Sequence, residues 1–348
     1  MSTNPVTIAN IARLAGVGTA TVDRVLNKRP GVNTETTKKV VDALATLGTL
    51  TVARGRPRQR EGFRFAYVLP EGNVPFYDKM ERLIAQVAGD FRHQHITEVT
   101  YRLDANDPVK FAAELSRISD CDGLVVVAPD VPAVKLAIND LVRAGIHVVT
   151  LFSDVAGSMR EAFIGADNRA AGRTAGLLLA QIAMPPKRDT LLLLSQSTRM
   201  SGEIERRIGF AQVLEERFAR VKLERLVELP SDDAGVYAAL TQAFKNDFDS
   251  ARLAGVYCVG VGTSGVIRAL QGLTNSPKQL PVGLVVHDFT DSHREHLIAG
   301  SLSYVLNQDI HYSILTASRV LRGLCDNLRG ALNTVQPRVE ILTAENLH

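Results

Sequence analysis

Residues 7–32 read TIANIARLAGVGTATVDRVLNKRPGV, and the apolar positions recur at helical spacing on both sides of a glycine turn. The apolar residues on one face of the first helix are Ile8, Ile11, Ala12 and Ala15. Those of the second helix, over residues 19–26, are Val22, Val25 and Leu26. Two short helices joined by a glycine-containing turn indicate a helix-turn-helix, whose second helix enters the major groove of DNA.

A third helix and an excess of positive charge complete this N-terminal head. Asn33 is a good N-cap for a helix over residues 34–47. The residues of that helix expected to point inward are Val40, Val41, Leu44 and Leu47. Residues 1–64 hold eleven Lys and Arg against four Asp and Glu, although the formal net charge of the chain is only +3. A basic head favours contact with a polyanion, but a solvated charged surface would give the same count.

Three segments of the head resemble the lactose-repressor (LacI) family almost position by position. They are TIANIARLAGV at residues 7–17, TVDRVLN at 21–27 and PGV at 30–32. The resemblance implies that Thr19, Ala20 and Arg24 read bases. Arg24 also has an independent case, because a guanidinium can grip guanine bidentately; a phosphate contact is its alternative role. The residues predicted to contact DNA are Thr7, Thr19, Ala20, Thr21, Arg24, Asn27, Arg54 and Arg56.

Two positions of the head depart from the family pattern. Gly18 and Asp23 each stand where the family usually has serine. An acid in the recognition helix repels the phosphate backbone, so we expect the preferred operator to differ from the common one.

The linker, residues 49–62, departs further from the family. The family has a short hinge helix here, but Gly55 and Pro57 are poor in a helix interior and the family's leucine is absent. The run Arg54-Gly55-Arg56-Pro57 resembles the core of an AT-hook, an extended arm whose arginines enter A·T-rich minor grooves. A flexible basic linker that contacts only phosphates is the alternative.

From residue 63 onward, strand-like and helical segments alternate. The strand-like segments are residues 65–69, 96–101, 123–127, 147–151, 190–194, 223–229, 255–259, 282–286 and 303–306, followed by 338–347. Amphipathic helices are expected between most of them, for example over residues 78–93 and 170–183. This alternation indicates parallel sheets covered by helices. The length favours two similar α/β lobes, with a ligand cleft at the carboxyl ends of the strands.

The segments that follow these strands resemble the sugar-binding core of the LacI family and of related periplasmic ribose-type proteins. They are NVPFY at 73–77, FSD at 152–154, IGADNRAAG at 164–172, ERRIGF at 205–210, VHD at 286–288 and NQD at 307–309. The resemblance implies aromatic stacking on a sugar and polar bonds to its hydroxyl groups, chemistry that suits a polyol. The predicted ligand-binding residues are Phe76, Tyr77, Phe152, Asp154, Arg206, Thr263, Asp288 and Gln308.

These residues also have structural alternatives. Phe76 and Tyr77 could be core aromatics, and Arg206 and Asp288 could be surface charges. Two further residues are expected to serve in turns or helix caps: Asp167 and Asn168.

The first lobe departs from ribose-type proteins at three positions. Phe152 and Ser153 stand where those proteins have Asp-Arg, and Ala128 stands where they have asparagine. Fewer polar groups on that side favour a ligand other than ribose, such as a less hydroxylated sugar or a cyclitol.

The run GVGTSG at residues 260–265 matches the dinucleotide-binding pattern GxGxxG, so an NAD-dependent dehydrogenase is a rival interpretation. The motif sits late in the chain, and Asp288 is farther along than the usual ~20 residues. We therefore interpret the glycines as positions of close backbone approach at the cleft rim. No nucleophile motif or metal-ligand spacing supports catalysis, so we predict no enzyme, no cofactor and no metal site.

Composition and chain ends complete the expected description. The widely spaced Cys121, Cys258 and Cys325 fit reduced thiols in the cytoplasm. The sequence shows no membrane span and no signal peptide, which disfavours a secreted binding protein.

The sequence thus predicts an all-α helix-turn-helix head (residues 1–48), a linker (49–62) and an α/β, two-lobed, periplasmic-binding-protein-like core (63–348) with two Rossmann-like parallel sheets. The expected function is a cytoplasmic transcriptional regulator, in the commoner case a repressor, controlled by a sugar or polyol. Its expected DNA partner is a pseudo-palindromic double-stranded operator bound by a homodimer, with tetramers left open.

Overall fold

The computed structural model describes residues 8–26, 29, 31–46, 62–72, 75–90, 95–183, 187–246, 248–260, 262–273, 280, 282–328 and 334–347. The chain divides into two compact units, Met1–Gly62 and Phe63–His348, which we call the head and the body. Most of the predicted linker, residues 49–61, lies outside the described residues.

Three helices form the head: α1 (Ile8–Ala15), α2 (Thr19–Leu26) and α3 (Thr34–Thr46). They pack around a small core of Ile11, Ala12, Val22, Val40 and Ala43. The predicted cap of α3 is confirmed, because the Asn33 side chain accepts a hydrogen bond of 2.8 Å from the Thr36 amide. The prediction that Val41 points inward is wrong, since this residue is 51% exposed. It lies about 100° around the helix from Val40, on the solvent side.

The first lobe of the body is built on a five-stranded parallel sheet of order β2-β1-β3-β4-β5. Its elements in chain order are β1 (Phe63–Pro70), α4 (Pro75–Asp90), β2 (Ile96–Leu103), α5 (Pro108–Leu115), β3 (Gly123–Val126), α6 (Pro132–Arg143), β4 (His147–Leu151) and β5 (Ala162–Ile164). The helix α12 (Ile310–Cys325) returns from the second lobe to cover one face of this sheet.

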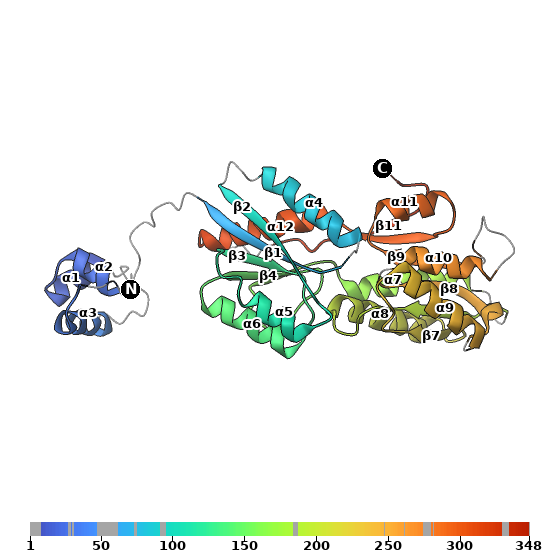
Figure 1. Cartoon of the computed structure of the whole chain (residues 1–348), viewed down its shortest axis with the longest axis horizontal. Helices are drawn as coiled ribbons and strands as arrows, with labels where there is room; N and C mark the ends of the chain where they lie inside the picture. The colour runs from blue at the N-terminus through green and yellow to red at the C-terminus, as the bar shows by residue number, and fades with distance from the viewer. Residues whose placement is uncertain are drawn as a thin grey trace. The chain divides into compact units, whose positions relative to one another are not determined.

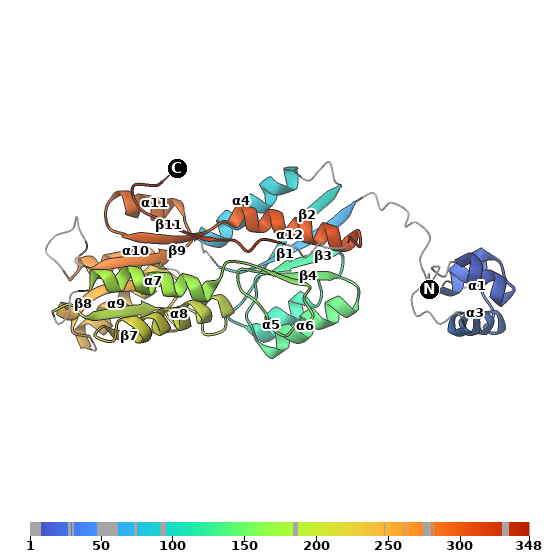
Figure 2. The same ribbon diagram turned by 180° about the vertical axis from the view of Figure 1, so that it is seen from behind.

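The second lobe is built on a six-stranded sheet of order β11-β10-β9-β8-β6-β7. Its elements are α7 (Asn168–Ile182), β6 (Thr190–Leu194), α8 (Ser201–Arg217), β7 (Lys222–Leu226), α9 (Asp233–Asn246), η2 (Ser250–Arg252), β8 (Leu253–Cys258), α10 (Thr263–Gln271), β9 (Gly283–His287), α11 (Asp291–Ile298), β10 (Tyr304–Gln308) and β11 (Val339–Leu342). Figures 1 and 2 show the two lobes as neighbours within the body, with α12 beside α4.

The chain passes between the lobes three times. It crosses from β5 to α7, from β10 to α12, and from α12 to β11. The first two crossings are short, and both end at an aspartate that caps the following helix: Asp167 accepts from the Ala170 amide and Asp309 from the Tyr312 amide. Short crossings hold the carboxyl ends of both sheets close to the space between the lobes, where ligand sites of such folds lie.

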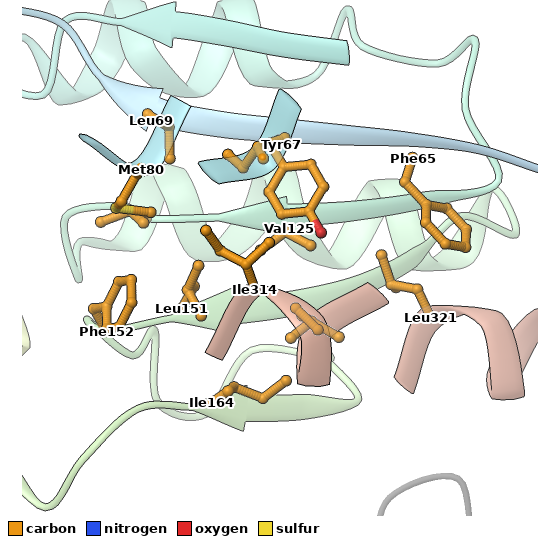
Figure 3. Packing of buried hydrophobic residues seen from close by; sticks show 14 of the residues in the cluster. Phe65, Tyr67, Leu69, Met80, Val125, Leu151, Phe152, Ile164, Ile314 and Leu321 are labelled. Atoms are coloured by element: carbon orange, nitrogen blue, oxygen red, sulfur yellow. The ribbon is translucent and has the colours of Figure 1, made fainter. Parts of the chain in front are cut away.

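Each lobe has its own apolar cores. In the first lobe, Phe65, Tyr67 and Leu69 of β1 pack against Ile314 and Leu321 of α12, so the returning helix is part of this core (Figure 3). The predicted parallel architecture is confirmed except at β11, which pairs antiparallel with β10. The sequence analysis missed β5, because three residues are too few to show a periodic pattern.

Helices α7 and α8 approach closely because glycines face each other's backbone. A Cβ placed on Gly172 would lie 1.9 Å from the Arg206 carbonyl oxygen, and one on Gly209 would lie 2.0 Å from that of Arg169. Both neighbours are backbone atoms, which cannot move aside without shifting a helix.

We therefore expect Gly172→Ala to lower the free energy of unfolding by about 1–3 kcal/mol, because the new methyl group overpacks this crossing. The midpoint of urea unfolding of the body measures the change. Gly272→Ala is the matched control, because a Cβ there would come no closer than 3.3 Å to another atom. An unchanged midpoint for Gly172→Ala would show that the helices are not in this contact.

Candidate functional site

The exposed face of α2 is the candidate DNA-binding surface. Thr19, Ala20 and Arg24 are exposed and Thr21 is half-buried, whereas Val22 on the opposite side is buried in the head core. The helix begins where the amides of Thr21 and Val22 donate to the Gly18 carbonyl. Among the other predicted DNA contacts, Thr7, Asn27, Arg54 and Arg56 lie outside the described residues.

Asp23, the unusual acid of α2, faces a cation after the helix. Its carboxylate lies 3.5 Å from the guanidinium of Arg29, whose amide in turn donates to the Arg24 carbonyl. The ion pair is exposed and therefore contributes little to stability. It does place a positive charge beside the acid, which reduces the repulsion that this acid exerts on a phosphate.

The first lobe holds an aromatic cluster at the edge of its core: Phe152 belongs to that core, and the partly buried Phe76 and Tyr77 pack against it. The ring centroids of Phe76 and Tyr77, in the first turn of α4, lie 5.4 Å apart. Phe76 is 5.5 Å from Phe152, which directly follows β4. Phe152 has a φ of +58°, a left-handed conformation that is uncommon for a bulky residue and holds its ring in this cluster.

The second lobe contributes a buried arginine. Arg206, in the first half of α8, is only 7% exposed. Its Nε donates to Oδ1 of Asn168 at 2.8 Å, and the Asn168 amide donates to the carbonyl of Phe152 at 3.1 Å. Asn168, the first residue of α7, therefore connects the buried cation to the first lobe, a contact beyond the turn or cap role expected for it. Asp167 does cap α7, as predicted.

Two half-buried acids accompany this arginine. Glu203 lies one helical turn before Arg206 and accepts hydrogen bonds from Ser195 and from the amides of Gln196 and Ser197. Burial raises its pKa, and these hydrogen bonds and the charge of Arg206 oppose the shift. Burial also raises the pKa of Asp288, and Arg206 again opposes the shift. The charges of Glu203, Asp288 and Arg206 all act on the Tyr77 hydroxyl, so the polar groups and the aromatic cluster share one site.

Gln308 is the fourth polar side chain of this site, beside Arg206, Glu203 and Asp288. Its Nε2 donates to Oδ1 of Asp288 at 2.9 Å. Its Oε1 is buried and, within the described part of the chain, has no hydrogen-bond partner. A buried carbonyl oxygen without a donor is costly, so this atom is suited to accept a hydrogen bond from a ligand.

A histidine supports the turn that carries Asp288. Asp288 has a φ of +63°, and its carbonyl accepts a hydrogen bond of 2.6 Å from Nδ1 of His293. The other ring nitrogen of His293 lies 3.0 Å from Oγ1 of Thr263. Because Nδ1 donates to a carbonyl, the neutral ring accepts from the threonine hydroxyl. Thr263 is thus linked to the site through this ring.

Burial lowers the pKa of His293 to about 4, and the nearby cation of Lys79 contributes to the decrease. The unfolded chain binds a proton here below about pH 6.5, whereas the folded chain does not until about pH 4. The contribution of the neutral His293 ring to the free energy of unfolding is therefore fully present above pH 6.5 and is lost as the pH falls towards 4. We expect His293→Gln to reduce this loss, by at most about 1.4 kcal/mol per pH unit. Urea unfolding between pH 4 and 7 measures it, with exposed His311→Gln as control.

Asp154 does not join the other predicted ligand residues. Its carboxylate is bound by the guanidinium of Arg160 and by the Thr150 hydroxyl at 2.7 Å. These contacts lower its pKa despite burial. Its carbonyl accepts from Ser201 of the second lobe at 2.7 Å, so the residue serves the structure between the lobes.

Lys79, which the sequence analysis did not single out, reaches across the lobes. Its Nζ donates to the Phe289 carbonyl at 2.8 Å and lies 5.4 Å from the centre of the Phe289 ring. Its place three residues after Phe76 on α4 could have identified it, because that spacing puts both on one helix face. Glu203 and His293 carried no comparable signal, since their role depends on distant segments.

The glycine motif near Thr263 has a packing role. Gly262 has a φ of +89° and precedes α10. A Cβ on Gly265 would lie 2.2 Å from the Asp233 carbonyl oxygen of α9, and one on Gly262 would lie 2.5 Å from the Val236 side chain. The predicted close backbone approach is therefore confirmed at Gly265, where the partner is helix α9, and the predicted place at the cleft rim stays a prediction.

Within the parts of the chain that the structure describes, no group of three or more His, Cys, Asp and Glu side chains is arranged to hold a metal ion. Over the same residues, none of the helices has the length and apolar character needed to cross a bilayer.

Comparison with known proteins identifies both units. The periplasmic binding protein domain family matches residues 65–326, and the lacI family of bacterial regulatory proteins matches residues 7–49. The chain therefore belongs to the periplasmic binding protein domain family. Its head carries the helix-turn-helix domain of the lacI family.

Curated relatives agree with this assignment. The chain is 34% identical over 93 residues to catabolite control protein A of Priestia megaterium, a match that covers 26% of this chain and 28% of that protein. It is 40% identical over 79 residues to the HTH-type transcriptional regulator MalR of Streptomyces coelicolor, covering 23% and 22%. The matched segment thus spans less than a third of the length of these relatives.

Solved structures share the fold of the body. The glucose-galactose binding protein GanP of Geobacillus stearothermophilus superposes with a TM-score of 0.71 at 16% identity, covering 83% of this chain and 99% of that one. A putative LacI transcriptional regulator of Bacteroides fragilis gives 0.71 at 18%, covering 82% and 98%. A carbohydrate transporter of Acidothermus cellulolyticus in complex with myo-inositol gives 0.68 at 19%, covering 82% and 95%.

Proposed function

We propose that this chain is a sequence-specific DNA-binding transcriptional regulator, acting as a repressor, whose operator affinity is controlled by a small sugar or polyol bound between the two lobes. One observation carries the proposal. A lacI-type head with an exposed recognition helix is joined to a body in which a buried arginine, two acids and an amide adjoin an aromatic cluster. This is the donor, acceptor and stacking set that suits a hydroxylated ring.

The proposed organisation follows the two units. Residues 1–48 bind DNA, residues 49–62 link this head to the body, and residues 63–348 bind the effector and form the dimer. Because one head contacts one half-site, the protein binds a pseudo-palindromic operator as a homodimer. Binding to chromosomal DNA places the protein in the cytoplasm. The curated relatives are transcriptional regulators, which supports a role without catalysis.

Contacts between the lobes supply the proposed control. Lys79 bonds the Phe289 carbonyl, and the Arg199 side chain of the second lobe donates to the Asn106 carbonyl of the first at 3.1 Å. An effector that contacts both lobes stabilises the arrangement in which these contacts form. The resulting change in the spacing of two heads alters operator affinity by a few kcal/mol at most.

The linker arginines are proposed to enter the minor groove as an AT-hook-like arm. We expect Arg54→Ala with Arg56→Ala to weaken binding most at operators with an A·T-rich centre. Fluorescence anisotropy with two operators that differ only at the centre measures this effect. Equal loss at both operators would instead indicate phosphate contacts alone.

The proposed function is tested with the purified full-length chain. Retention on operator DNA at low salt, together with a rise in the melting temperature on addition of a sugar or polyol, is the expected result. Failure to bind any duplex at low salt would contradict it. The rival interpretation, an NAD-dependent dehydrogenase, is tested in parallel by fluorescence titration of the protein with a nicotinamide cofactor. We expect no binding of this cofactor.

A further inference from the structure

We propose that the effector is uncharged and has two unlike sides: hydroxyl groups face the second lobe, and an unsubstituted carbon side, such as that of a deoxy sugar, faces the first lobe. This inference rests on the proposed function and specifies its ligand. It follows from a difference between the lobes: the second lobe has hydrogen-bond donors and acceptors that lack a partner, and the first lobe has few.

The second lobe leaves both donors and acceptors unused. Gln308 is 3% exposed and its Oε1 has no partner among the described residues. Among the described residues, the Asp288 carboxylate accepts a hydrogen bond only on Oδ1, from Gln308. Arg206 carries five N–H donors, of which one bonds Asn168 at 2.8 Å and another reaches the Val259 carbonyl only at 3.5 Å. A hydroxyl group both donates and accepts, so neighbouring hydroxyls can satisfy these groups together.

The charges of the site favour an uncharged ligand. A phosphate or carboxylate would satisfy Arg206, but it would lie against the acids Asp288 and Glu203 and has no proton for the Gln308 carbonyl. An ammonium group would satisfy the acceptors but would meet the buried Arg206 cation. Like charges in a poorly solvated site repel strongly, so neither kind of ion fits well.

The first lobe offers little to a hydroxyl group. Its ring cluster consists of Phe76, Tyr77 and Phe152. Apart from the Tyr77 hydroxyl, its nearby polar side chains already have partners in the described structure: the hydroxyl of Ser153 lies 3.1 Å from that of Ser201, Asp154 is bound by Arg160, and Lys79 bonds Phe289. A hydroxyl that leaves water for this aromatic side forfeits its hydrogen bonds, whereas a C–H or methyl surface packs on the rings.

Isothermal titration with the full-length protein tests the inference. The probes are matched sets of D-galactose, 6-deoxy-D-galactose and D-galactose 6-phosphate, and of D-glucose, 6-deoxy-D-glucose and D-glucose 6-phosphate. In at least one set we expect the deoxy sugar to bind tenfold or more tightly than the parent, and the phosphate to bind more weakly than both. A parent sugar or phosphate that binds as tightly as the deoxy form in every set overturns the inference and leaves the proposed function standing.

If no probe binds while operator DNA is still retained, both this inference and the proposed control by sugars fail. Phe152→Asn sharpens the test, because asparagine tolerates the left-handed φ of this position and places an amide on the apolar side. We expect this variant to reduce or reverse the preference for the deoxy sugar. Phe152→Leu, which keeps the side apolar, should retain the order of preference, and an identical shift in both variants would overturn the inference.

Discussion

Replacing Arg206 by methionine is expected to lower effector affinity by about 100-fold or more and to leave operator binding without effector within about twofold. The guanidinium is buried, donates to Asn168, and its charge lowers the pKa of the nearby acid Asp288 against the effect of burial. Its removal takes away a cation that acts on both Asp288 and Glu203, and it also removes hydrogen-bond donors from the ligand. The head lies in the other compact unit, so its DNA contacts do not depend on this side chain.

Isothermal titration gives the effector affinity, and fluorescence anisotropy gives the operator affinity. Arg207→Met is the matched control, because it removes the same charge from the neighbouring position of α8. Operator binding by the Arg206 variant also shows that the head has folded. Unchanged effector affinity would mean that the ligand lies elsewhere in the body.

Replacing Arg24 by alanine is expected to weaken binding to the preferred operator by about 10- to 100-fold and to relax the preference at one base pair. Arg24 is exposed on the same face of α2 as Thr19 and Ala20. A bidentate contact to guanine contributes about 1–3 kcal/mol of discrimination, which corresponds to this range. Because such a contact is made to a base, the dependence of affinity on salt should change little.

Lys39→Ala is the control for this experiment. Lys39 is an exposed cation of α3 whose Nζ lies 2.9 Å from Glu35, and it tests the loss of one positive charge from the head. Affinity for a panel of operators with single base changes, measured at several salt concentrations, separates the two roles of Arg24. A uniform loss at all sequences with a smaller salt dependence would assign Arg24 to a phosphate instead.

Much of the candidate ligand site was predictable, because its residues directly follow strands. Arg206 was predicted from its matching segment rather than from a strand end. Phe152, Asp288 and Gln308 stand at the carboxyl ends of β4, β9 and β10. Asp154 shows the limit of this reasoning: the same position in the chain suits a ligand contact or an ion pair, and Arg160 decides between them only in three dimensions.

The head and the alternating body were readable along the chain because helix and strand periodicity, caps and turns act between residues a few positions apart. The ends of α2, β4 and β6 follow from such local patterns. Contacts between segments far apart in sequence decide the return of α12 to the first lobe, the partial burial of Glu203 and, among the described residues, the lack of a partner for the Gln308 oxygen. Patterns between near neighbours in the sequence do not specify these long-range contacts. Only the folded lobes therefore show which polar groups remain for a ligand.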